Sequence, residues 1–83
     1  MAQSHEDVVS LVETIVLSLV DDADAVSLDD YVESDGLHID ITVSEDEVGK
    51  VIGRQGRVIK AIRLMARAAA SQYGSNVEVE VMG

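Results

Sequence analysis

The chain contains no cysteine, no proline, no tryptophan and no phenylalanine among its 83 residues. Without cysteine it cannot form disulfides or thiolate metal sites, so a small chain depends on helix and sheet packing or on oligomerisation. No apolar run approaches the roughly 20 residues of a membrane helix. The first residues lack the basic segment that is typical of a secretory signal, so we expect no such signal. Length and apolar content predict one globular domain over residues 1–83, and the missing cysteine is compatible with the cytoplasm.

Positive charge is scarce and confined to one segment. The chain has six Lys or Arg and 16 Asp or Glu, for a net charge of −10. The cations all lie in residues 50–67, which contain no acid: Lys50, Arg54, Arg57, Lys60, Arg63 and Arg67. Because local charge governs what a surface attracts, this segment can bind an anion although the whole chain is acidic. A solvated basic helix face is the alternative interpretation.

Apolar residues recur at helical spacing from Val8 to Val20, and a run of aspartates at 21, 22 and 24 ends the pattern. This predicts an amphipathic helix. Its polar face carries no lysine or arginine, which anionic lipid would require, so we expect the helix to pack on the core and not on a membrane.

Three strands are predicted. Residues 25–33 give the weaker pattern, whereas residues 37–43 alternate cleanly between apolar and polar side chains. Ser-Asp-Gly at 34–36 predicts a tight turn between them, because glycine readily adopts positive φ. In the last strand, residues 77–81, three valines alternate with two glutamates.

Two helices are predicted between the second and third strands. Ser44 and Glu47 have the spacing of a capping box at the start of a short helix. Gly56 begins a longer helix that extends roughly to Tyr73, with Gly74 as its stop signal. The order is α-β-β-α-α-β, and the helical crossover should make the strands that flank it parallel. We therefore expect an α+β fold with a three-stranded mixed sheet and three helices packed on one face.

The most specific motif is Gly53-Arg54-Gln55-Gly56, followed by Arg57. Two glycines let the backbone turn sharply and let another backbone approach closely. The free amides and positive dipole end of the following helix favour anions, and the two arginines supply donors suited to phosphate. The alternative is that the glycines serve packing alone.

The stretch at 51–62, Val-Ile-Gly-Arg-Gln-Gly-Arg-Val-Ile-Lys-Ala-Ile, resembles the glycine-loop pattern of KH domains. The element order is similar to the type II, bacterial arrangement, and the continuation to residue 70 resembles the KhpA family. The resemblance implies a non-catalytic RNA chaperone or post-transcriptional regulator whose loop clamps about four nucleotides of single-stranded RNA. It also implies a homodimer, or a heterodimer with a larger KhpB (Jag/EloR-like) protein.

On this interpretation the RNA-binding residues cluster around the loop. They are Gly49, Lys50, Ile52, Gly53, Arg54, Gln55, Gly56, Arg57 and Lys60. We expect phosphates at the loop and bases in a groove between the short helix, the loop and the 37–43 strand. Because Tyr31 and Tyr73 are the only aromatic residues, recognition by an aromatic stacking platform is excluded.

The long helix divides into three faces at about 100° per residue. Its basic face holds Arg57, Lys60, Arg63 and Arg67. Its predicted core face holds Val58, Ile59, Ile62, Met65, Ala66 and Ala69. A small-residue strip, Ala61, Leu64 and Ala68, remains and is a candidate dimer contact. A protein–protein interaction module that uses this strip is the alternative function.

Catalysis is not expected. His5 and His38 are the only histidines, and neither has an evident catalytic partner. The glycine loop lacks the lysine and hydroxyl residue that end a nucleotide P-loop. We therefore predict no catalytic residue, no metal site and no cofactor.

Overall fold

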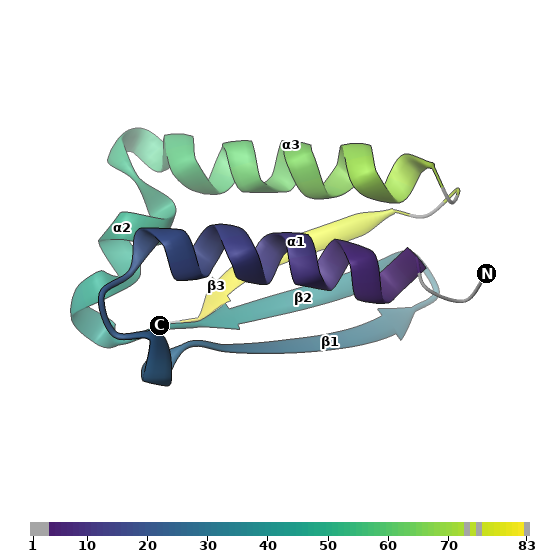
Figure 1. Cartoon of the computed structure of the whole chain (residues 1–83). Helices are drawn as coiled ribbons and strands as arrows, with labels where there is room; N and C mark the ends of the chain where they lie inside the picture. The colour runs from purple at the N-terminus through teal and green to yellow at the C-terminus, as the bar shows by residue number, and fades with distance from the viewer. Residues whose placement is uncertain (1–3, 73, 75, 83) are drawn as a thin grey trace.

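A computed structural model describes residues 4–72, 74 and 76–82 (Figure 1). Its main elements are α1 (Ser4–Leu19), β1 (Ser27–Glu33), β2 (Gly36–Thr42), α2 (Val48–Ile52), α3 (Arg57–Ser71) and β3 (Val77–Met82). Short 3-10 turns precede β1, α2 and α3: η1 (Ala23–Ala25), η2 (Glu45–Glu47) and η3 (Arg54–Gly56). The predicted α-β-β-α-α-β order is confirmed. No helix within the described residues is long and apolar enough to cross a bilayer.

β2 is the central strand of a three-stranded sheet. It pairs antiparallel with β1 and parallel with β3, as the hairpin and the helical crossover predicted. The helices lie on one face, with α1 and α3 side by side above the sheet and α2 at one end (Figure 1). Gly36 at the hairpin has a φ of 129°, and a Cβ there would lie 2.5 Å from the carbonyl oxygen of Asn76. Glycine thus lets the hairpin pack against the segment that enters β3.

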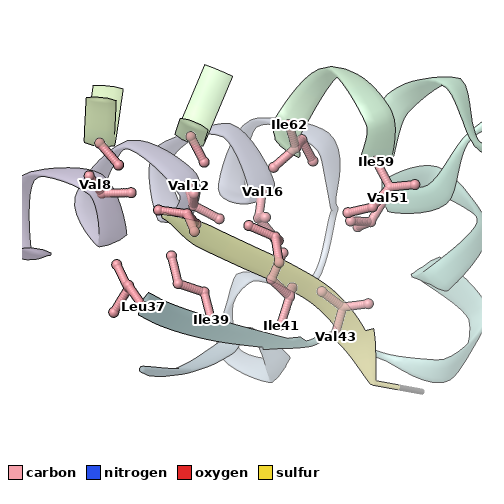
Figure 2. Packing of buried hydrophobic residues seen from close by; sticks show 14 of the residues in the cluster. Val8, Val12, Val16, Leu37, Ile39, Ile41, Val43, Val51, Ile59 and Ile62 are labelled. Carbon is pink, nitrogen blue, oxygen red and sulfur yellow. The ribbon is translucent and has the colours of Figure 1, made fainter. Parts of the chain in front are cut away.

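The core lies between one face of α1 and the helix-facing side chains of β2. Val8, Val12 and Val16 are spaced four residues apart, share one face of α1 and are fully buried. Figure 2 shows them directed toward alternate residues of β2, which are also fully buried: Leu37, Ile39 and Ile41. The β-branched valines are weak helix formers, so this burial stabilises α1 more than intrinsic propensity does.

α3 buries a narrower face than the sequence predicted. Its buried side chains are Ile59, Ile62, Ala66 and Ala70, with Val58 and Ala69 packed against them in part. The placement of Met65 in the core was wrong, because it lies beyond the edge of this arc and 43% of it is exposed. The strip of Ala61, Leu64 and Ala68 is exposed, as predicted.

The end of α3 lies close to its predicted position. The helix ends at Ser71, whose hydroxyl donates to the carbonyl of Ala68. Gly74 has a φ of 73°, as expected for a glycine stop signal. The predicted last helical residue, Tyr73, falls outside the described residues.

The sheet face that carries no helix is acidic. The strand register places Asp29 beside Asp40, and Asp40 beside Glu80, across the three strands. Tyr31 and His38 form the next pair, with their rings stacked at a centroid distance of 5.2 Å. Tyr31 therefore lies on the opposite face from the helices and the glycine loop.

Candidate nucleic-acid interface

The glycine loop between α2 and α3 contains three residues with positive φ: Gly53, Gln55 and Gly56. Gly53 and Gly56 have φ values of 78° and 74°. A Cβ on Gly53 would lie 2.4 Å from Cγ2 of Val58 and 2.8 Å from its backbone nitrogen, whereas a Cβ on Gly56 would meet nothing closer than 4.0 Å. Gly53 is therefore required for contact with the first turn of α3, and Gly56 for backbone conformation alone.

Gln55 has the only positive φ, 58°, of any non-glycine residue in the described part of the chain. Such a conformation costs energy, and conformations of this kind concentrate at functional sites. Nη2 of Arg57 donates to the Gln55 side-chain oxygen at 3.3 Å, and the side chains of Arg54, Gln55 and Arg57 are all exposed. The loop thus presents two guanidinium groups and an amide beside the N-terminus of α3, an arrangement suited to phosphate.

Glu47 fixes α2 against the end of α1. It is the only buried charged side chain among the described residues, with 5% of its surface exposed. Its carboxylate accepts the backbone N–H groups of Asp21 at 2.6 Å and Asp22 at 2.9 Å. These two hydrogen bonds lower the pKa of Glu47, because they favour its ionised form.

This contact shows that the predicted Ser44–Glu47 capping box was wrong. The Ser44 hydroxyl donates to the Asp46 carboxylate at 2.6 Å, and no side chain caps the η2 turn. Because the segment begins with a 3-10 turn, Glu47 is directed across to the α1–β1 connection. A capping-box pattern is local and carries no information on a partner more than 20 residues earlier.

Lys50 belongs to the same cluster. Its Nζ lies 2.9 Å from the Asp21 carboxylate and 3.0 Å from that of Glu47. Hydrogen bonds to Asp21 and then Glu47 raise the pKa of Lys50, so it remains charged but locally neutralised. In the free protein this cation stabilises the α1–α2 connection, and its contact with RNA stays a prediction.

A groove of about 190 Å³ adjoins the glycine loop. It is lined by Ile52, Ile59, Arg63, Glu80 and Val81, and we call it the loop groove. Its strand wall is β3, which corrects the predicted wall of residues 37–43. β2 is the central strand, and its helix-facing side chains are completely buried, so only the edge strand β3 remains open beside the loop.

A second hollow, of about 390 Å³, lies farther along α3. It is lined by Lys60, Arg63, Leu64, Arg67 and Glu78, and we call it the α3–β3 hollow. Nε of Arg63 donates to the carbonyl of Val79 at 2.9 Å, and Nε of Arg67 to that of Val77 at 3.4 Å. The two arginines therefore cover carbonyls on the exposed edge of β3, which limits pairing with another strand.

Comparison with known proteins identifies the family. The sequence model of the KhpA/KhpB KH domain matches residues 9–81. The chain belongs to the KhpA/KhpB family of KH domains. It is 40% identical over 73 residues to the RNA-binding protein KhpA of Halalkalibacterium halodurans, a match that covers 88% of this chain and 96% of the relative.

Two other bacterial KhpA proteins show the same relationship. The RNA-binding protein KhpA of Clostridium perfringens is 40% identical over 72 residues, which cover 87% of this chain and 96% of that protein. The RNA-binding protein KhpA of Borreliella burgdorferi is 38% identical over 74 residues, which cover 89% of this chain and 90% of that protein. Membership of this family confirms the KH resemblance and the prediction that the chain is not an enzyme.

Within the KhpA/KhpB fold, the predicted RNA-binding residues fall in three places. The loop residues Gly53–Arg57 lie at the α2–α3 junction, and Ile52 lines the loop groove. Lys60 lines the α3–β3 hollow, beyond the loop. Gly49 and Lys50 lie in α2, where Lys50 is bound to the Glu47 cluster.

Sequence reasoning missed two features of this KhpA/KhpB domain. Glu47 was assigned to a local cap, and no pattern in the chain connects it with Asp21. The roles of Val81 and Arg63 in the loop groove depend on which strand lies at the sheet edge. The parallel crossover alone would have indicated that edge, since the hairpin partner occupies the other side of β2.

One cluster has the composition of a metal site but lies elsewhere. Ligand atoms of Glu33, Asp35 and His38 are within 4.8 Å of one another at the β1–β2 turn. Nε2 of His38 is 2.8 Å from the Asp35 carboxylate, a hydrogen bond that raises the pKa of His38 and lowers that of Asp35. This pairing accounts for the arrangement without an ion.

Proposed function

We propose that the chain binds single-stranded RNA by clamping its backbone at the Gly53-Arg54-Gln55-Gly56 loop. The observation that carries the proposal is the left-handed loop geometry, which presents Arg54 and Arg57 beside the N-terminus of α3. The relatives are named as RNA-binding proteins, which supports the same ligand class for this chain. A role as an RNA chaperone or post-transcriptional regulator in the bacterial cytoplasm is consistent with a non-catalytic family.

In this proposal the loop binds the phosphates of the RNA and the loop groove binds its bases. Phosphates contact the side chains of Arg54, Gln55 and Arg57 beside the N-terminus of α3. Bases enter the groove against the apolar side chains of Ile52 and Val81. Because Tyr31 lies on the opposite sheet face, no described aromatic residue stacks on them. We expect modest affinity and loose base selectivity.

Replacing Arg54 and Gln55 with aspartate tests the clamp. The double variant should lose RNA binding in fluorescence anisotropy but keep its fold, because both side chains are exposed. An Arg54→Lys/Gln55→Asn variant is the matched control and should retain most of the binding. With about four phosphates engaged, the wild-type log–log salt slope should be near −3. Normal RNA binding by the aspartate variant would show that the loop assignment is wrong.

The exposed strip on α3 supports a second candidate function. Leu64 is 70% exposed, and exposed alanines at 61 and 68 leave space for another helix to approach. We propose a dimer contact through Ala61, Leu64 and Ala68, with a second copy or with a KhpB protein.

Charge at Leu64 should disrupt this contact. Leu64→Glu is expected to lower the mass measured by light scattering from dimer to monomer. Leu17→Glu is the control, since Leu17 is also an exposed helix leucine but lies on α1. A Leu64→Glu protein with the wild-type dimer mass would contradict the proposal.

A further inference from the structure

The α3–β3 hollow adjoins the loop groove. Arg63 lines both, and both lie between α3 and the edge strand β3. The hollow extends from Lys60 to Arg67, a length of about 10 Å along the helix. An RNA strand held at the glycine loop would reach this hollow by following α3 away from the loop.

The hollow concentrates cations in an acidic protein. Three of its five lining residues are cationic, and its one acid, Glu78, has its carboxylate 3.8 Å from Nη2 of Arg67. The Lys60 side chain is exposed and makes no hydrogen bond or ion pair with another described residue. A polyanion leaving the loop in this direction meets positive charge, whereas the open sheet face would repel it.

The arginines of the hollow are held in place before any ligand arrives. The Nε atoms of Arg63 and Arg67 donate to backbone carbonyls of β3, which restricts both side chains. Each guanidinium also carries terminal N–H groups that can bind phosphate. Because their side-chain entropy is already reduced, less is lost on binding.

Leu64 supplies an apolar surface between these cations. It lines the hollow and is 70% exposed. The volume of about 390 Å³ lies within the range of small-ligand sites. Cationic donors around an apolar side chain match the chemistry of a nucleotide, which has an anionic phosphate and a base with an apolar face.

We infer that the α3–β3 hollow is a second nucleotide subsite, which binds nucleotides of the same RNA strand beyond those clamped at the glycine loop. Lys60 and Arg67 contact phosphates there, and Leu64 contacts a base. The inference rests on the proposed RNA-binding function and extends its footprint along α3.

The test compares RNA lengths. Anisotropy titrations use a tetranucleotide and an octanucleotide of the same mixed sequence, with wild-type protein and Arg67→Gln. The variant should weaken octanucleotide binding about five- to tenfold, as expected for one lost contact to a charged group, and tetranucleotide binding less than about twofold. An octanucleotide offers more binding positions than a tetranucleotide, but this does not affect the result, because wild type and variant are compared on the same RNA. Arg67→Lys, which keeps the charge, should retain most of the octanucleotide affinity.

A second measurement needs no variant. For wild-type protein, each further phosphate engaged should steepen the log–log salt slope by about 0.7. Two further contacts would therefore make the octanucleotide slope steeper than the tetranucleotide slope by about 1.4.

The outcomes separate this inference from the proposed function. The second subsite would be wrong if wild-type protein showed equal salt slopes for the two RNAs, or if Arg67→Gln lost equal affinity for both. Either result would leave the loop clamp intact. Equal slopes together with a monomeric Leu64→Glu protein would assign the hollow to a protein partner instead. If wild-type protein bound neither RNA, both proposals would fail.

Discussion

At the scale of single residues, Glu47 is the one charged side chain of the described chain that is buried. Its buried carboxylate accepts two backbone N–H groups from the α1–β1 connection and pairs with Lys50. Removing one partner of such a group leaves the others unsatisfied, which costs more than the hydrogen bond itself contributes. The position of α2, and with it that of the glycine loop, therefore depends on this carboxylate.

Glu47→Gln is expected to lower the midpoint of thermal unfolding by several degrees, because an amide has only one oxygen to accept the two N–H groups. Glu45→Gln, an exposed neighbour, is the control. The folded-state pKa of Glu47 is lowered, so its contribution is complete above the unfolded-state pKa of about 4.3. The difference in unfolding midpoint between wild type and Glu47→Gln should become smaller as the pH falls below that value. A constant difference from pH 7 to pH 3, measured by circular dichroism, would contradict the assignment.

His38 should give stability the opposite pH dependence. Its hydrogen bond to Asp35 raises its pKa, so its contribution is complete below the unfolded-state value of about 6.5 and is lost as the pH rises through the folded-state value. Relative to His38→Gln, wild-type protein should therefore be more stable at pH 5.5 than at pH 8.5 in thermal melts. Asp35→Asn should remove the same pH-dependent difference. If Asp35→Asn kept it, another partner of His38 would be responsible.

At the scale of the element, the glycines of the α2–loop–α3 unit have three different roles, which alanine substitution can separate. Gly53→Ala combines positive φ with a Cβ 2.4 Å from Val58, so it should destabilise the fold most and abolish RNA binding. Gly56→Ala meets nothing closer than 4.0 Å and should cost about 1–2 kcal/mol for its left-handed backbone. Gly49→Ala lies in α2 with open space around it, and should stabilise the protein by up to about 1 kcal/mol.

Urea unfolding of the three alanine variants measures this order. The loop geometry would be wrong if Gly53→Ala were no less stable than Gly56→Ala. Gly49→Ala also serves as a folding control, because the same substitution is made one turn before the loop.

Sequence periodicity predicted the elements well because each pattern lies within its own segment. The alternation of Leu37, Ile39 and Ile41 identified β2, and Gly53 and Gly56 marked the loop. The capping box at Ser44 and the β2 wall of the groove were wrong because each depends on which distant segments meet in the folded chain. Periodicity predicts which face of an element is buried, but not which distant segment packs against that face.

At the scale of the whole molecule, charge is divided between two surfaces. The helix-free sheet face places Asp29, Asp40 and Glu80 in one row, whereas three cations of α3 line the α3–β3 hollow: Lys60, Arg63 and Arg67. The net charge of −10 is therefore a poor guide to the ligand. On the proposed function, acidic surfaces would repel RNA from the sheet and direct it toward the loop and the α3–β3 hollow.

The two proposed uses of α3 lead to competition, because Leu64 belongs both to the dimer strip and to the α3–β3 hollow. A partner helix seated on Leu64 would cover the hollow, so RNA that extends beyond the loop and a second copy exclude each other. Adding octanucleotide should lower the mass of the wild-type protein–RNA complex toward one protein chain per complex in light scattering. Tetranucleotide, held at the loop alone, should leave the dimer intact.

Arg67→Gln separates competition from a general effect of RNA on self-association. The variant keeps Leu64, and with it the proposed dimer contact, but lacks a cation of the hollow, so dissociation should require about five- to tenfold more octanucleotide. Dimers that persist with saturating octanucleotide would show that the strip and the hollow act independently. In that case the second copy would have to approach Leu64 from the Ala61 and Ala68 side, leaving the edge of β3 open to RNA.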